Sequence, residues 1–355
     1  MIRVLIVDDS TVARDLLKHI LSSDPEIIVV GEAKDGLEAI ELARVCKPDV
    51  ITMDITMPKL NGFEATRQIM EKTPVPIVIV TASWDPKDIG KTWLAVEAGA
   101  VAAIEKPRYS KDKNNCKCFG NIIDTVKLMS QVKVVRRWST KRTSDMFNKL
   151  SEAPIKISKG TTVERYGIVA IGASTGGPLV IKELLEVLSA DFPAPIVIVQ
   201  HIARNFTAGF AEWLGKSTSL EVKIAKQGNR LEPSIVYIAP NGSQMKIGLG
   251  GHVILTNDPP ENGLRPSISY LFRSIANAFG SRAIAILLTG MGKDGANELK
   301  ALKDIGAITI AQDKETSVVH GMPGEAIKIG GASYIASPQK IAGLLSRLVG
   351  GADKK

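Results

Sequence analysis

The stretch "YGIVAIGASTGGPLVIKELLEVL" (residues 166–188) decides the fold of the C-terminal half of the chain. An apolar run enters a Gly-rich turn, and apolar residues at helical spacing leave it, with Pro178 where the first helical turn tolerates it. Ser174 lies in the turn, with Gly172 and Gly176 two positions away on each side. A serine at such a junction is exposed above the sheet edge, where backbone N–H groups of the helix start also point.

The same alternation of strand and helix continues to the C-terminus. We expect strands over residues 168–172, 195–200, 235–240, 252–257, 283–289, 307–312 and 332–336, and helices over 178–189, 206–216, 268–279, 295–305 and 340–349. Alternating elements predict a doubly wound, mostly parallel α/β sheet of the Rossmann-like type. The segment 234–257 has two strand patterns and no helix between them, which predicts an antiparallel hairpin.

The first 125 residues contain five βα units of their own. Expected strands cover 3–7, 26–33, 49–54, 76–82 and 100–107, and expected helices cover 11–22, 36–47, 62–72, 91–99 and 119–132. This pattern predicts a flavodoxin-like (βα)5 domain, with a parallel sheet covered on both faces. We therefore expect one domain over residues 1–125, a basic linker over 126–162 and a second domain over 163–350.

Composition narrows the class of protein. The chain has 355 residues, which favours two domains. It has no long uncharged apolar run, and its N-terminus lacks the pattern of a signal peptide, so no direct membrane insertion is expected. Three cysteines, an odd and sparse count, indicate a reducing compartment and a cytoplasmic location.

The net charge of +8 is concentrated in the middle of the chain. Residues 106–160 hold 14 Lys and Arg against 4 Asp and Glu, so the rest of the chain is slightly acidic. A basic segment can contact nucleic acid or an acidic partner, but it is more often a solvated linker. Residues 161–355 show no compact three-helix pattern, so we expect no nucleic-acid partner.

Charged residues follow three strands of the N-terminal half. Asp8 and Asp9 follow the first strand, Asp54 the third and Lys106 the fifth. The carboxyl ends of strands in such a sheet line one crevice, so these groups should converge. Three carboxylates together call for a hard cation such as Mg²⁺. Asp54 could then accept a phosphoryl group, with Lys106 and the hydroxyl of Thr81 stabilising its oxygens.

Residues 1–125 resemble the response-regulator receiver family in these motifs. The resemblance implies phosphorylation at Asp54, a Mg²⁺ site at Asp8, Asp9 and Asp54, and switch roles for Thr81 and Lys106. It also implies a cis bond between Lys106 and Pro107. Ala103 departs from the aromatic residue common there, so the signal is expected to pass through the loops around Asp54 and Thr81.

Three interpretations of Ser174 remain open from the residues alone. The turn lacks the lysine and spacing of a phosphate-binding loop, and a turn of Gly and Ser needs no function. As a nucleophile, Ser174 needs a base. His201 follows the next strand along the chain and should lie on the same rim. Asp294, Asp258 and Asp313 each follow a strand as possible orienting acids, and the Gly-flanked loop favours Asp294.

The whole chain resembles the CheB family of chemotaxis response-regulator protein-glutamate methylesterases and glutaminases. The motifs that carry the resemblance are "AIGASTGG", "QHIARNFTAGFAEWL", "IAPNG", "LRPSISYLF", "LLTGMGKDG" and "AQDKETSVVHGMPGEA". The resemblance implies a triad of Ser174, His201 and Asp294, an oxyanion donor at the N–H of Met291, and Thr175 beside the histidine. Lys293 and Ser269 depart from common family forms, and neither belongs to the triad.

The expected function is that of a phosphorylation-activated serine hydrolase. It would demethylate glutamyl methyl esters, and deamidate glutamines, on methyl-accepting chemotaxis receptors during adaptation. A chemotaxis histidine kinase would supply the phosphoryl group, and the catalytic domain would need no cofactor. The alternative is a non-catalytic scaffold on a Rossmann-like sheet, which reaction of Ser174 with a serine-directed reagent would exclude.

Overall fold

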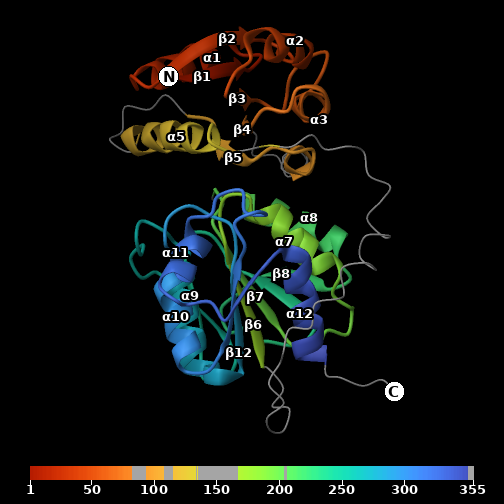
Figure 1. Cartoon of the computed structure of the whole chain (residues 1–355), viewed down its shortest axis with the longest axis vertical. Coiled ribbons are helices and arrows are strands. Elements are labelled where there is room, and N and C mark those ends of the chain that lie inside the picture. Colours follow the sequence, from red (N-terminus) through yellow and green to blue (C-terminus); the bar gives the residue numbers. More distant parts are fainter. Residues whose placement is uncertain (82–92, 108–114, 133, 135–166, 204–205, 351–355) are drawn as a thin grey trace.

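A computed structural model describes residues 1–81, 93–107, 115–132, 134, 167–203 and 206–350, which form two α/β domains (Figure 1). The N-terminal sheet has the strand order β2-β1-β3-β4-β5, all parallel. Its strands are β1 (Ile2–Val7), β2 (Ile27–Ala33), β3 (Val50–Met53), β4 (Ile77–Thr81) and β5 (Ala102–Glu105), and its helices are α1 (Thr11–Ser22), α2 (Gly36–Cys46), α3 (Gly62–Lys72) and α5 (Asn115–Met129). This confirms the flavodoxin-like (βα)5 prediction.

The N-terminal sheet is buried on both faces. Helices α1 and α5 cover one face, with Leu17 and Ile122 in its core. Helices α2 and α3 cover the other face with Ala39 and Ile69, together with a short helical segment at residues 93–97. Burial on both faces explains why every residue of β3 and β4 is buried and why apolar residues dominate both strands without a polar alternation.

The second domain has a seven-stranded sheet in the order β14-β13-β12-β6-β7-β9-β8, with parallel neighbours throughout. The strands are β6 (Ile168–Ala173), β7 (Ile196–Gln200), β8 (Glu221–Ile224), β9 (Ile235–Ile238), β12 (Ala283–Leu287), β13 (Ile308–Gln312) and β14 (Tyr334–Ala336). The order reverses between β12 and β7, on either side of β6. Ligands of such sheets bind at the carboxyl ends of the strands near this point.

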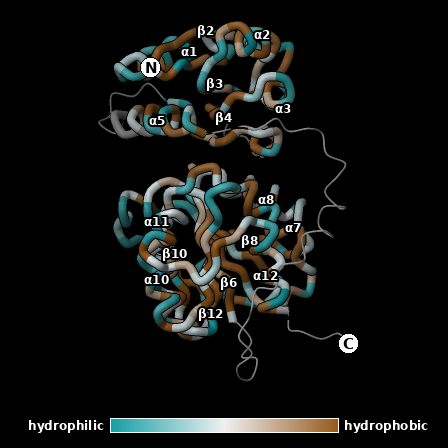
Figure 2. Tube along the Cα trace, viewed as in Figure 1, coloured by the Kyte–Doolittle hydropathy of each residue, from teal (hydrophilic) through white to brown (hydrophobic). Residues whose placement is uncertain are grey.

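Helices cover both faces of this sheet (Figure 1). One face carries α7 (Gly177–Glu186), α8 (Thr207–Ser217) and α12 (Pro338–Gly350), and the other carries α9 (Ile268–Phe279), α10 (Ala296–Asp304) and α11 (Met322–Lys328). The hydrophobic segments run through the sheet and the inner sides of the helices (Figure 2). The mostly parallel, doubly wound prediction is therefore confirmed.

The antiparallel hairpin is present, but its strands differ from those expected. It pairs β10 (Gln244–Ile247) with β11 (Val253–Thr256), whereas β9 joins the main sheet. The sequence "QMKI" of β10 is short and half polar, which hides it from pattern analysis. The strand β8 and the seven-residue helix α11 were also not predicted, because each is too short to show a full period.

Two further expectations were a cis peptide bond at Lys106–Pro107 and a basic linker between the domains. Among the described residues the cis peptide bond is Arg265–Pro266, so the expectation of a cis bond at Lys106–Pro107 was wrong. Most of the expected basic linker, residues 135–162, lies outside the described residues, and the domain boundaries remain predictions. No helix in the described part of the chain is long and apolar enough to cross a membrane.

Gly62 at the start of α3 is required by close packing. A Cβ atom there would lie 1.9 Å from the carbonyl oxygen of Asp54. The Gly62 N–H also donates to the carbonyl of Ile55 at 2.9 Å, which fixes the loop that follows β3. The backbone around Asp54 therefore has no room for a side chain at position 62.

We predict that Gly62→Ala lowers the free energy of unfolding of the N-terminal domain by at least about 2 kcal/mol, because backbone must move to admit the methyl group. Gly120→Ala in α5 is the matched control, since nothing lies within 4 Å of its Cβ position. The control should stabilise the helix by roughly 0.5–1 kcal/mol. Chemical unfolding of both variants checks this, and equal stabilities would contradict the close-packing argument.

Candidate functional site

Ser174 lies in the turn between β6 and α7, as the sequence predicts. Its N–H donates to the carbonyl of Thr289 at 3.0 Å, and its own carbonyl accepts from the N–H of Gly177 at 2.9 Å. Gly176 has a φ of 77°, in the left-handed region. A Cβ on Gly177 would lie 2.3 Å from Oε1 of Gln200. Both glycines are therefore needed to form this turn.

His201 follows β7, the strand beside β6. Its N–H donates to the carbonyl of Ala173 at 3.0 Å. His201 and Ser174 therefore follow two paired, parallel strands at the same edge of the sheet. The side-chain amide of Gln200 donates to the carbonyls of both Ser174 (2.8 Å) and His201 (3.0 Å). One buried amide thus ties together the backbones of the expected nucleophile and base.

Asp294 is the acid that reaches His201. Its Oδ2 lies 3.0 Å from Nε2 of the histidine. The other two acids that the sequence left open have different partners. Asp258 accepts from the hydroxyl of Tyr270, and Asp313 accepts from the N–H of its own loop residue Thr316 at 3.0 Å. The Nε2–Asp294 contact leaves Nδ1 of the His201 ring for a second partner.

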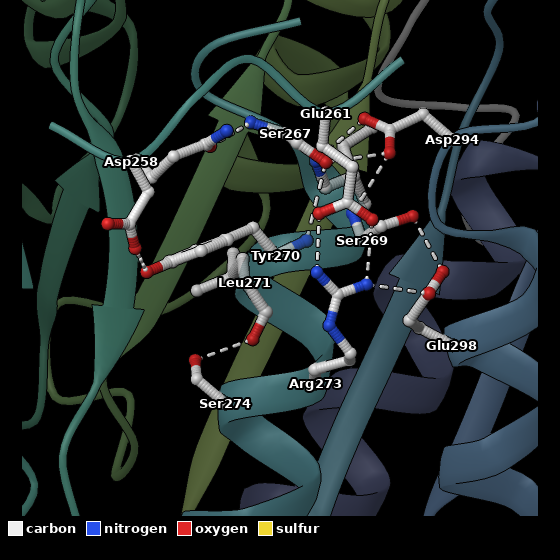
Figure 3. A network of polar contacts seen from close by, with 12 residues as sticks. Asp258, Glu261, Ser267, Ser269, Tyr270, Leu271, Arg273, Ser274, Asp294 and Glu298 are labelled. Atoms are coloured by element: carbon white, nitrogen blue, oxygen red, sulfur yellow. Dashed lines mark hydrogen bonds and ion pairs between the residues drawn. The ribbon is translucent and has the colours of Figure 1, made fainter. Parts of the chain in front are cut away.

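The start of helix α9 holds the Asp294 carboxylate (Figure 3). Oδ1 accepts from Oγ of Ser267 at 2.9 Å and from the N–H of Ser269 at 3.0 Å, and Oδ2 accepts from the N–H of Ile268 at 2.7 Å. Burial alone would raise the pKa of this carboxyl. The close contact with His201 and its charge, together with the two backbone N–H groups, outweigh burial and lower the pKa to about 2. Asp294 is therefore an anion near neutral pH.

Two supporting residues expected from the resemblance also lie at this edge. A Cβ on Gly290 would lie 2.6 Å from Cβ of Ser174, so the backbone leading to Met291 passes beside the serine. The Met291 side chain is exposed. The carbonyl of Thr175 accepts from Oγ1 of Thr289 at 2.9 Å, which anchors the turn from the other side. His320 contacts Ser317 instead, with Nδ1 3.2 Å from the serine hydroxyl.

Three residues that support the site were not predicted from the sequence: Gln200, Ser267, and Ser269 as a partner of Asp294. The N-cap role of Ser267 could have been predicted, because a serine just before an apolar helical pattern is typical of an N-cap. In the structure its Oγ accepts from the N–H of Tyr270. Gln200 gives no such signal, since its role depends on the pairing of two strands.

The acidic cluster of the N-terminal domain forms as expected. One carboxylate oxygen from each of Asp8, Asp9 and Asp54 lies within 4.8 Å of the others. Nζ of Lys106 lies 2.7 Å from Asp8 and 2.9 Å from Asp54. Thr81 ends β4 and is buried, and its carbonyl accepts from the N–H of Lys106 at 3.0 Å. The structure therefore brings all five residues to one edge.

The carboxylates of this cluster suit a hard divalent cation. Burial raises the pKa of Asp54, Lys106 lowers it and Asp8 raises it again, so that the pKa is about 6. The ammonium group of Lys106 therefore neutralises only part of the negative charge of the carboxylates. Each of the three aspartates offers one oxygen ligand, and Asp9 is exposed to solvent. This set suits Mg²⁺, which would keep coordination positions open for other oxygen ligands.

We predict that Asp294→Asn destabilises the chain by about 2 kcal/mol at pH 7. The folded pKa of about 2 lies below the ordinary 3.8, so the stabilisation is present above pH 3.8 and is lost as the pH falls through 2. Urea unfolding should show a narrower gap between wild type and variant at pH 3 than at pH 7. A gap that is absent or independent of pH would contradict this.

Comparisons with known proteins match family models to both domains. The CheB methylesterase family model matches residues 169–345, and the response regulator receiver domain model matches residues 4–113. A protein-glutamate methylesterase/protein-glutamine glutaminase of Syntrophus aciditrophicus is 49% identical over 350 residues, covering 99% of each chain. One from Nitrosospira multiformis is 51% identical over 349 residues, covering 98% of this chain and 97% of that one.

A solved structure gives a further similarity. The catalytic domain of Thermotoga maritima CheB methylesterase is 40% identical, with a TM-score of 0.49, and the match covers 50% of this chain and 96% of that one. The matches to these two relatives cover 98–99% of this chain, across both domains. The chain therefore belongs to the CheB methylesterase family.

Proposed function

We propose that this protein is a phosphorylation-activated serine hydrolase that acts on methyl-accepting chemotaxis receptors. The enzyme class, a protein-glutamate methylesterase and protein-glutamine glutaminase, follows from its family. The observation that carries the proposed mechanism is the 3.0 Å contact between His201 and Asp294, at the sheet edge where Ser174 turns into α7.

In this mechanism Oγ of Ser174 attacks the carbonyl carbon of a glutamyl methyl ester. Nδ1 of His201 takes the serine proton and then gives it to the leaving methanol, while Asp294 stabilises the imidazolium. Water, deprotonated by His201, hydrolyses the acyl-enzyme and restores the glutamate. A glutamine amide reaches the same acyl intermediate by releasing ammonia.

The oxyanion of each tetrahedral intermediate needs donors beside Ser174. The proposed donor is the N–H of Met291, which the passage of Gly290 beside the serine supports. A donor of this kind is typically worth about 3 kcal/mol of the barrier. Met291 contributes through its backbone, which is consistent with its exposed side chain.

The N-terminal domain would control the hydrolase through Asp54. Asp8, Asp9 and Asp54 would hold Mg²⁺, which supplies charge neutralisation for the phosphoryl oxygens. Oδ2 of Asp54 already lies 2.9 Å from Nζ of Lys106, and the Thr81 hydroxyl belongs to the same edge. The phosphodonor would be a chemotaxis histidine kinase, and the protein would act in the cytoplasm.

Contacts between the two domains support the proposal that the N-terminal domain controls substrate access to the catalytic edge. Trp93 of the N-terminal domain packs against Phe210 and Trp213 of α8, with ring centroids 5.0 and 5.5 Å apart. Glu97, one turn further on, accepts from Lys182 of α7 at 2.8 Å. These helices begin beside the catalytic edge, where Figure 1 also places β5 and α5. Phosphorylation would shift the equilibrium away from this packing.

We predict that Ser174→Ala abolishes methanol release from methylated receptor, because the proposed acyl-enzyme forms on Oγ of Ser174. The variant should fold, since Oγ of Ser174 has no role in the turn geometry described above. Unfolding curves that overlay those of wild type are the control. Retention of near wild-type turnover would contradict the proposed mechanism.

We predict that Trp93→Ala raises the rate of methanol release by the unphosphorylated full chain several-fold. Loss of a buried indole weakens the packing of one domain on the other, so the open form becomes more populated. The matched control is Leu94→Ala, whose side chain is exposed on the same helical segment and should leave the rate unchanged. Equal rates for both variants would contradict control by access.

A further inference from the structure

The side chain of Ser269 joins the loop of Asp294 to helix α9 (Figure 3). Its N–H donates to Oδ1 of Asp294 at 3.0 Å, and its Oγ accepts from the N–H of Gly295 at 2.9 Å. The same Oγ donates to Oε2 of Glu298 on α10 at 2.6 Å. Ser269 is 4% exposed, so water does not readily replace these contacts.

The direction of the hydroxyl proton is fixed by these partners. A serine hydroxyl has one proton to donate, and its oxygen already accepts from Gly295. The proton must therefore point to Glu298, which must offer an oxygen acceptor. Arg273 holds Glu298 in place, with Nη1 2.9 Å from Oε1, and also pairs with Glu261.

We propose that Ser269 and Glu298 are positioning residues that align Asp294 with His201. They do so through a chain of alternating donors and acceptors from Arg273 to the Asp294 loop. The proposal rests on the catalytic triad of the proposed function. Because the polar contacts of both side chains go to the Asp294 loop, to each other and to Arg273, their loss should slow the chemical step without weakening substrate binding.

The Asp294 loop and the start of α9 are also closely packed. Gly295 has a φ of 82°, and a Cβ there would lie 2.5 Å from Cγ2 of Ile268, so the loop and the helix start are in contact. The link through Ser269 therefore limits how far the Asp294 loop can shift relative to the start of α9. A misplacement of about 1 Å in a catalytic group can cost on the order of a hundred-fold in rate.

The test is methanol release by full-length variants, with kcat and KM measured separately. Ser269→Ala and Glu298→Ala should each lower kcat about ten-fold or more at unchanged KM. Glu298→Gln keeps an oxygen acceptor for the hydroxyl and should recover most of the loss. Ser269→Asp should be impaired, because its carboxylate meets Glu298, and adding Glu298→Gln should restore part of its kcat.

Ser274→Ala is the matched control on the same helix. Its Oγ donates to the carbonyl of Leu271 at 2.6 Å and accepts from the N–H of Ile247 at 3.0 Å, away from Asp294. It should keep wild-type kcat even where it lowers the unfolding midpoint. Wild-type kcat for Ser269→Ala, an equal loss for Ser274→Ala, or a change in KM alone would overturn the positioning role.

Asp294→Asn, measured in parallel, separates this proposal from the triad assignment. An inactive Asp294→Asn beside a fully active Ser269→Ala overturns only the positioning role. Wild-type turnover by Asp294→Asn overturns the triad itself, and the positioning role with it.

Discussion

The carboxylate of Asp294 reaches His201 because the first turn of α9 holds it there. Two backbone N–H groups and the Ser267 hydroxyl bind it. Burial raises its pKa, but His201 and the two backbone N–H groups outweigh burial and keep the pKa near 2. The serine, the histidine and the aspartate follow β6, β7 and β12, three neighbouring strands of one sheet. The parallel sheet sets the spacing, and α9 sets the orientation of the acid.

The same sheet edge connects chemistry to control. A hydrolytic site at the carboxyl ends of parallel strands is open to solvent unless another part of the protein approaches it. Here the indole of Trp93 meets α8, and Glu97 pairs with Lys182 of α7, whose first residues form the Ser174 turn. In the proposed function, a change at Asp54 would act on turnover through this packing, and Ser174 itself would not need to change.

The sequence predicted most of the two α/β folds and the residues at the strand ends, because parallel strands carry long apolar runs and their carboxyl ends meet. The residues alone favoured Asp294 over Asp258 and Asp313 only by its Gly-flanked loop, since a decisive choice depends on hydrogen bonds between distant segments. Gln200 and the Ser269–Glu298 contact were invisible for the same reason. The partner of β11 was missed because "QMKI" is shorter than a recognisable strand pattern.

The central claim is that the N-terminal domain regulates access to a preformed triad. Methanol release by the full chain, with and without Mg²⁺ and a small-molecule phosphodonor, tests it most directly when Asp54→Ala is measured beside wild type. The account predicts that the phosphodonor accelerates release by wild type and leaves Asp54→Ala at its basal rate. An equal response of both proteins, or no response of wild type, would contradict the account.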